Sequence, residues 1–195
     1  MPSIDVKKRC IDSKIVYYGP GQSGKTENLK YVYEHLDAGH KGRLNSLPTK
    51  ADPSLYIDVL PVRFGQIIGF DTTFHLCSGP GQALAINTRK LLLRDTDGIV
   101  FVADSRPSRR EANVDSFQEL HEILEEYGLQ LRNVPHVIQY NKCDLPDKVG
   151  LEDLRAELNR YGVPEFQAST VSGKNVLETL RAVVRSLSTD LEKRL

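Results

Sequence analysis

The sequence of 195 residues has no tryptophan, a single methionine and only three cysteines. Cys10, Cys77 and Cys143 are scattered along the chain, their number is odd, and no Cys-x-x-Cys pair occurs. This pattern excludes a disulfide framework and a cysteine-rich zinc site, and it is typical of proteins in a reducing compartment. We therefore expect the chain to work in the cytoplasm.

An excess of charge of one sign is also missing. Lys and Arg together number 26, as do Asp and Glu, so the formal net charge is +0. This balance argues against a nucleic acid as the main partner. No apolar run is long enough to span a bilayer, and neither end shows a lipidation signal. We expect one domain over residues 1–195, a monomer without its own membrane anchor.

Short apolar runs alternate with longer helical patterns, and this alternation predicts an α/β fold whose mostly parallel sheet is flanked by helices. The six runs are residues 15–18, 56–60, 74–77, 98–103, 136–140 and 165–168. Only residues 61–71 separate the second run from the third, which is too short for a helical crossover. We therefore expect an antiparallel hairpin there and one reversed strand in the sheet.

Two segments carry apolar side chains at helical spacing, residues 114–127 and 176–191. Such stripes usually cover a sheet, and we interpret both as core rather than as partner sites. Residues 39–52 show no comparable pattern, and we expect a long mobile loop there. Arg106, Arg109 and Arg110 form a small basic cluster, which is either a solvated helix start or, less commonly, a partner patch.

A phosphate-binding loop is predicted between the first apolar run and the helical pattern that follows it. The segment matches GxxxxGK[ST] and reads Gly19, Pro20, Gly21, Gln22, Ser23, Gly24, Lys25, Thr26. Glycines let backbone N–H groups surround a phosphate, and the helix N-terminus adds partial positive charge. Lys25 suits the β- and γ-phosphates, and the Thr26 hydroxyl suits Mg²⁺. The alternative is a glycine-rich turn that ends in Lys-Thr by chance.

A base-reading motif, Asn141, Lys142, Cys143 and Asp144, follows directly on the apolar run 136–140. The Asp144 carboxylate only accepts hydrogen bonds, so it suits the N1–H and N2–H₂ donors of guanine, which adenine lacks. Asn141 is expected to tie this segment to the phosphate loop, and the Lys142 stem to cover the base. The alternatives are a plain strand-ending turn and a P-loop enzyme that uses ATP.

Longer strings resemble the MglA family of bacterial Ras-like GTPases, which set cell polarity and gliding motility. These strings are residues 14–21, 74–76, 89–91, 97–104, 137–142 and 144–146. The resemblance covers nearly the whole chain. It implies a mixed six-stranded sheet with one antiparallel strand, a GDP/GTP cycle with Mg²⁺, a Roadblock-domain activator of the MglB type and polarity partners of the RomR type.

The resemblance also assigns residues outside the two motifs. Gln82, after Gly81, matches the glutamine that orients the attacking water, although it is alternatively an ordinary surface residue. Ala168 and Ser169 match the last GTPase motif, in which the backbone N–H at the Ala168 position meets guanine O6. Ser54 matches the hydroxyl that meets Mg²⁺ or the γ-phosphate.

The chain departs from its relatives at catalytic positions. Ser78 stands where ordinary GTPases place an Asp near Mg²⁺, and Pro53 replaces an intrinsic arginine finger, a group worth about 10³–10⁵ in rate. Residues 83–86 replace an aromatic pair in switch II. Two functions follow: a Ras-like switch that hydrolyses GTP slowly, or a polarity scaffold that binds nucleotide with weak or absent hydrolysis.

Overall fold

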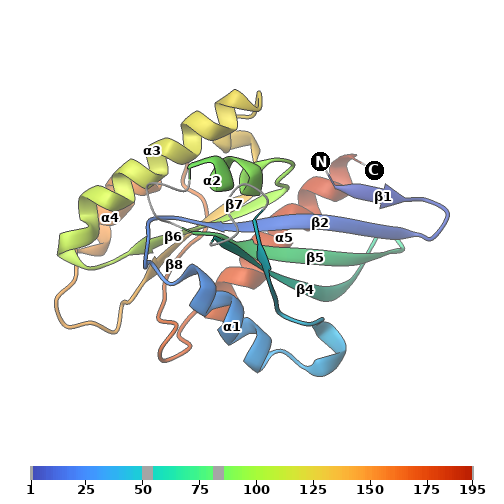
Figure 1. Cartoon of the computed structure of the whole chain (residues 1–195), viewed down its shortest axis with the longest axis horizontal. Coiled ribbons are helices and arrows are strands. Elements are labelled where there is room, and N and C mark those ends of the chain that lie inside the picture. Colours follow the sequence, from blue (N-terminus) through green and yellow to red (C-terminus); the bar gives the residue numbers. More distant parts are fainter. Residues whose placement is uncertain (1, 50–54, 81–85, 195) are drawn as a thin grey trace.

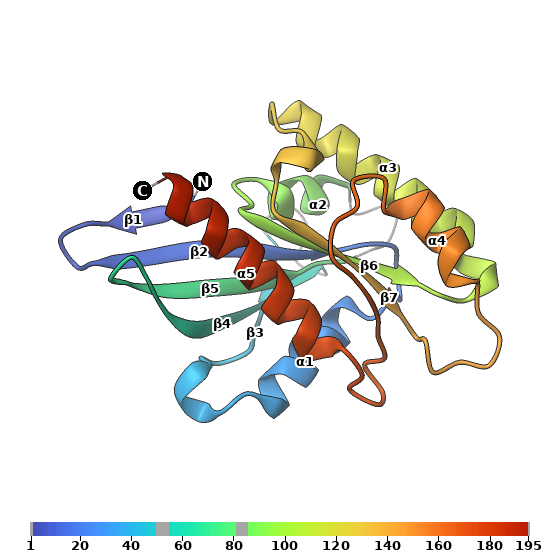
Figure 2. The same ribbon diagram turned by 180° about the vertical axis from the view of Figure 1, so that it is seen from behind.

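The computed structural model describes residues 2–49, 55–80 and 86–194, which form one twisted sheet with helices on both faces (Figures 1 and 2). The strands are β1 (Ser3–Asp5), β2 (Cys10–Tyr18), β3 (Asn45–Pro48), β4 (Tyr56–Ile67), β5 (Phe70–Ser78), β6 (Gly98–Asp104), β7 (His136–Asn141) and β8 (Glu165–Gln167). The α-helices are α1 (Lys25–His35), α2 (Ile86–Leu93), α3 (Arg110–Glu126), α4 (Leu151–Leu158) and α5 (Val176–Arg194).

The sheet order is β3-β4-β5-β2-β6-β7-β8, and β1 pairs with β2. The six predicted strands and the antiparallel hairpin β4–β5 are confirmed. The strand count is wrong, because the sheet has eight strands and two of them, β1 and β4, run against the others. The two extra strands are short and mostly exposed, so they show no apolar pattern. One of them, β3, lies inside the segment 39–52 that we expected to be a loop.

Two apolar layers hold the helices on the sheet. Helices α1 and α5 pack on one face together with side chains of β2, β4, β5 and β6, and α2, α3 and α4 cover the other. The predicted stripes are confirmed as core, since Phe117, Leu120 and Leu124 of α3 are buried, as are Val183 and Leu187 of α5. No helix of the described residues is long and apolar enough to cross a membrane.

The strands β2, β6, β7 and β8 are parallel, so their carboxyl ends meet at one edge of the sheet. In parallel sheets this edge is where ligands bind. The phosphate loop leaves β2 there, and the segment that carries Lys142 leaves β7. The fold therefore brings the two motifs to one place, although more than a hundred residues separate them in the chain.

Candidate functional site

The phosphate loop fits tightly between β6 and the base-reading motif because two of its glycines leave no room for a side chain. Gly19 has φ +142°, and a Cβ atom there would lie 2.2 Å from the Val102 carbonyl oxygen. Gly24 has φ +100°, and a Cβ there would lie 2.2 Å from Nδ2 of Asn141. Such positive φ angles are natural only for glycine. Gly19 and Gly24 are thus required by the backbone path itself.

Lys25 begins α1 and turns back over the loop. Its Nζ donates to the carbonyl oxygens of Gly19 at 2.9 Å and of Pro20 at 2.7 Å. The pKa of Lys25 falls from 10.5 to about 8, chiefly because of burial and in smaller part because of the charges of Arg89 and Arg109. In the described part of the chain, no carboxylate pairs with this ammonium group. The loop therefore holds a desolvated cation that a phosphate would neutralise.

Three side-chain oxygen atoms gather at Thr26, the residue that follows Lys25. Thr26 Oγ1 donates to Oδ2 of Asp58 at 2.8 Å, and Ser78 Oγ donates to the same oxygen at 3.2 Å. The hydroxyl oxygens of Thr26 and Ser78 are 3.3 Å apart. Asp58 lies on β4 directly opposite Ser78 on β5, so a neighbouring strand supplies the carboxylate that position 78 lacks.

Sequence reasoning missed Asp58. The signal that could have found Asp58 is the predicted hairpin, since the residue that pairs with Ser78 has its side chain on the same face of the sheet. The pairing register depends on an irregularity between Arg63 and Gln66, and the sequence pattern does not show it.

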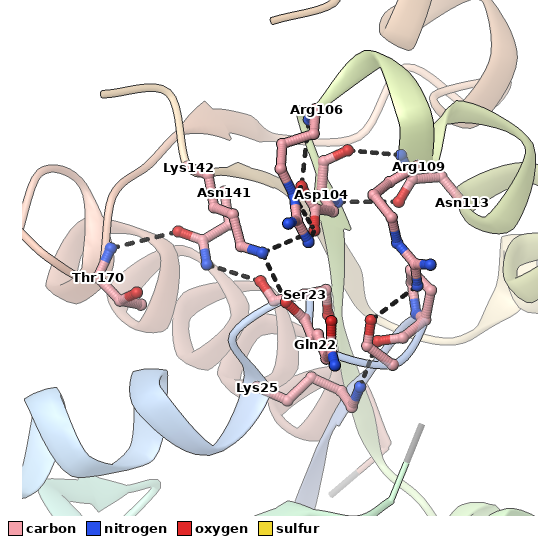
Figure 3. A network of polar contacts seen from close by, with 12 residues as sticks. Gln22, Ser23, Lys25, Asp104, Arg106, Arg109, Asn113, Asn141, Lys142 and Thr170 are labelled. Carbon is pink, nitrogen blue, oxygen red and sulfur yellow. Dashed lines mark hydrogen bonds and ion pairs between the residues drawn. The ribbon is translucent and has the colours of Figure 1, made fainter. Parts of the chain in front are cut away.

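The base-reading motif is tied to the phosphate loop by two side chains (Figure 3). Asn141 Nδ2 donates to the Ser23 carbonyl oxygen at 2.7 Å, which confirms the predicted tie, and its Oδ1 accepts from the Thr170 N–H at 3.2 Å. Lys142 Nζ donates to the Gln22 carbonyl oxygen at 2.7 Å. Loops after β2, β7 and β8 therefore form one connected unit.

Asp104, at the end of β6, anchors this unit through Lys142 and was given no role from the sequence. Its side chain is fully buried, and it accepts from Lys142 Nζ at 2.7 Å and from Nη2 of Arg106 at 2.6 Å (Figure 3). Burial alone would raise the pKa of Asp104, but the hydrogen bonds from Arg106 and Lys142 outweigh it and lower the pKa. Asp104 is thus an ionised buried group that fixes the direction of the Lys142 side chain.

The far end of the site differs from the prediction. Asp144 is exposed and accessible to a base. Ala168 is fully buried, and its N–H donates to the Tyr140 carbonyl oxygen at 2.8 Å. The predicted contact of this N–H with guanine O6 is therefore wrong, because a group already used within the fold is not free for the ligand. Ser169, also fully buried, uses its N–H on the Lys174 carbonyl oxygen at 3.0 Å.

Some predicted residues lie outside the described residues. They are Gly81, Gln82 and Ser54 of the predicted site, together with Pro53 and residues 83–85 of the predicted departures.

Comparison with known proteins then settles the family. Over 193 residues the chain is 48% identical to the mutual gliding-motility protein MglA of Myxococcus xanthus, and the match spans 99% of both chains. The chain belongs to the MglA family of small GTPases. Residues 69–187 also match the ADP-ribosylation factor family.

More distant relatives share only a part of the chain. GTPase Obg of Clostridium perfringens is 30% identical over 100 residues, which are 48% of this chain and 23% of Obg. GTPase Obg of Listeria innocua is 28% identical over 119 residues, or 60% of this chain and 28% of that protein. Both of these partial relatives are named as GTPases, which agrees with the assignment to a family of small GTPases.

Membership in the MglA family decides between the two functions left open by the sequence. It supports a Ras-like guanine-nucleotide switch, and it does not favour a scaffold without turnover. The geometry of the site suits a guanine nucleotide as the ligand. A cleft of about 260 Å³ opens over the phosphate loop, and its lining residues are Gln22, Gly24, Lys25, Thr26, Glu27, Gly79 and Pro80.

The cluster of Thr26, Asp58 and Ser78 predicts how this MglA-family site responds to removal of Mg²⁺. We expect chelation by EDTA to weaken GDP binding about 100-fold in the wild type and less than tenfold in Asp58→Asn. The reason is that the Asp58 carboxylate repels phosphates unless a cation lies between them, and nearby charges in a protein interact by several kcal/mol.

Titration calorimetry with GDP, in Mg²⁺ and in EDTA, measures this difference. Asp71→Asn, on the exposed end of the same hairpin, is the matched control and should behave as the wild type. Equal effects of EDTA on the wild type and on Asp58→Asn would rule out this role for Asp58.

Proposed function

We propose that this protein is a guanine-nucleotide switch that regulates cell polarity or gliding motility through partners that bind one nucleotide state. The observation that carries the proposal is that Asn141 and Lys142 hydrogen-bond the base-reading motif to the phosphate loop. The full-length similarity to an MglA named for gliding motility supports the cellular role.

Each part of the site takes one part of the nucleotide in this proposal. The backbone N–H groups of residues 19–24 surround the phosphates, and Lys25 leaves its carbonyl partners to bind the β- and γ-phosphates. Asp144 accepts from the guanine N1–H and N2–H₂ groups. Since the N–H groups of Ala168 and Thr170 are both already used, we assign the side-chain hydroxyl of Thr170 to the O6 side of the base.

The residues present also fit a magnesium ion. Mg²⁺ prefers hard oxygen ligands and keeps several waters, and hydroxyl and carboxylate oxygens of Thr26, Asp58 and Ser78 lie together beside the phosphate cleft. When bound with the nucleotide, Mg²⁺ would neutralise charge on the β- and γ-phosphates. Thr26 is the direct protein ligand in this proposal, and Ser54 remains a second one.

Turnover in this proposal depends on Gln82, which orients the attacking water. Pro53 carries no charge and cannot act as an arginine finger, so we propose slow hydrolysis unless another cation or a partner compensates. By resemblance to the MglA family, the partners are a Roadblock-domain activator of the MglB type and polarity proteins of the RomR type. In this view the protein works in the cytoplasm and is brought to a cell pole by such partners.

Single-turnover hydrolysis tests the switch directly. The protein loaded with GTP is expected to release phosphate slowly, faster with a Roadblock-domain partner, and at least tenfold more slowly after Gln82→Leu, because the water is no longer oriented. Gln118→Leu, at an exposed position of α3, is the matched control. Phosphate release that is absent from the wild type in both conditions would favour the scaffold instead.

A further inference from the structure

Arg109 contacts the phosphate loop from outside the nucleotide cleft. It ends the short 3₁₀ helix Pro107–Arg109 directly before α3, and its Nη2 donates to the Gly21 carbonyl oxygen at 2.9 Å. Lys25 takes the carbonyl oxygens of the two residues before Gly21 in the loop. Figure 3 shows the two side chains converging on the same loop. Two cations therefore share three successive carbonyl groups.

In the part of the chain that the structure describes, no ion pair offsets the charge of Arg109. No carboxylate oxygen of the described residues lies within 4.0 Å of its guanidinium, and its Nε is buried without an acceptor. The adjacent arginines differ, since Arg106 pairs with Asp104 and Arg110 pairs with Glu157. Each member of the basic cluster seen in the sequence thus has its own contact within the fold, and Arg110 is exposed at the start of α3, as expected for a solvated helix start.

A second arginine near the loop, Arg89 of α2, is held in a different way. Its Nη2 lies 2.5 Å from Oε2 of Glu119, so its charge is largely offset. Arg89 and Arg109 line the same open cleft of about 660 Å³, which also borders Gly21 and Gln22 of the phosphate loop. Asp115 and Glu119 line this cleft as well, and among the described residues Arg89 forms an ion pair there whereas Arg109 does not.

The uncompensated charge lies close to where the last phosphates would bind. Lys25 is the residue that reaches the β- and γ-phosphates in such loops, and the charge of Arg109 contributes to lowering the pKa of Lys25. Two like charges on one loop repel each other, and an anion in the loop removes that repulsion. A triphosphate, with its additional negative charge, removes it more fully than a diphosphate.

We propose that Arg109 is a positioning residue that favours GTP over GDP, by holding the Gly21 carbonyl and placing a positive charge behind the loop. This inference rests on the proposed function. It also identifies a charge directly before α3 that works near the γ-phosphate in a chain whose arginine-finger position is Pro53. The contact is with the protein backbone, so Arg109 acts through the loop and not by direct contact with the nucleotide.

The ratio of affinities for GTPγS and GDP tests the inference. Arg109→Gln retains a donor for the Gly21 carbonyl but removes the charge, and we expect it to reduce the preference for GTPγS about tenfold, as expected for loss of a unit charge several ångströms away. Arg109→Lys keeps the charge and should stay within about threefold of the wild type. Competition against a fluorescent guanine nucleotide in Mg²⁺ gives both affinities.

Arg110→Gln, one residue further on and paired with Glu157, is the matched control and should leave the ratio unchanged. The inference is overturned if Arg109→Gln keeps the ratio, if it weakens both nucleotides equally, or if Arg109→Lys loses the preference as fully as Gln does. The melting temperature without nucleotide identifies a variant that fails to fold. If Arg109→Gln fails to fold, the affinity ratio of Arg109→Lys alone tests the inference. A wild type that binds neither nucleotide would instead overturn the proposed function, before any variant is compared.

Discussion

Replacing Lys25 with Met should abolish measurable binding of GDP and GTP while it stabilises the nucleotide-free protein. Lys25 is 7% exposed, and within the described residues its ammonium group bonds to loop carbonyls alone. Its pKa falls from 10.5 to about 8 on folding, chiefly because burial removes water from the ammonium group. The difference between the two pKa values corresponds to ~3 kcal/mol of destabilisation in the wild type. Lys25→Met removes this destabilisation but also loses the hydrogen bonds to the loop carbonyls, so we expect its free energy of unfolding to rise by a net ~1–2 kcal/mol.

The pH dependence of this stabilisation follows from the same values. Lys25 is protonated in both the folded and the unfolded chain below pH 8, so the full destabilisation is present there. It declines as the pH rises from about 8 towards 10.5, because the folded protein releases its proton first. The stabilisation of Lys25→Met relative to the wild type should therefore be greatest at pH 7 and should decline as the pH rises above about 8.

Thermal melting without nucleotide and calorimetry with GDP measure the two effects. Lys30→Met is the matched control, because Lys30 lies on the same helix but is half exposed and pairs with Glu27 at 2.8 Å. It should change neither property appreciably, since exposed ion pairs contribute little. GDP affinity of Lys25→Met within tenfold of the wild type, or a lower melting temperature at pH 7, would contradict the role assigned to this buried cation.

Replacing Asp144 with Asn should change the preferred base from guanine to xanthine. A carboxylate accepts two hydrogen bonds from guanine, and its loss costs about 1.5–3 kcal/mol or more for a charged acceptor, roughly 100-fold in GTP affinity. Xanthine carries an oxygen at C2 where guanine carries an amino group, so the Asn side-chain NH₂ group can donate to it. Xanthosine triphosphate should then bind more tightly than GTP.

Competition between the two triphosphates for a fluorescent nucleotide measures this exchange. Asp147→Asn is the matched control, since Asp147 is exposed and lies only three residues further along the same loop. It should keep the wild-type preference for GTP. If Asp144→Asn also keeps that preference, the base is read elsewhere in the site.

The hairpin β4–β5 shows how far sequence reasoning reached in this protein. The short spacing between two apolar runs predicted the hairpin, and the structure confirms it. The register does not follow from that spacing, because it shifts between Arg63 and Gln66. This shift places Asp58 opposite Ser78, where regular pairing continued from Ile67 and Phe70 would have placed Val59. The carboxylate in the oxygen cluster was therefore beyond prediction.

Two further differences have the same origin. Asp104 received no role because nothing in the sequence around it shows that Lys142 reaches it across 38 positions. Ala168 received a role in base recognition that its amide cannot fill, since the amide follows the strand pairing with Tyr140. In both cases, the partner of a polar group depends on how distant segments meet.

The sequence by itself determined the phosphate loop, the base-reading motif, the alternation of strands and helices, and the family. These features depend on neighbouring residues: glycines with positive φ, a lysine and a threonine at a helix start, and apolar side chains at regular spacing. Only the tertiary structure decided the two extra strands, the oxygen cluster at Asp58, the buried anchor Asp104 and the place of Arg109 behind the loop. Each of these depends on the register and packing of segments far apart in the chain, which local patterns do not encode.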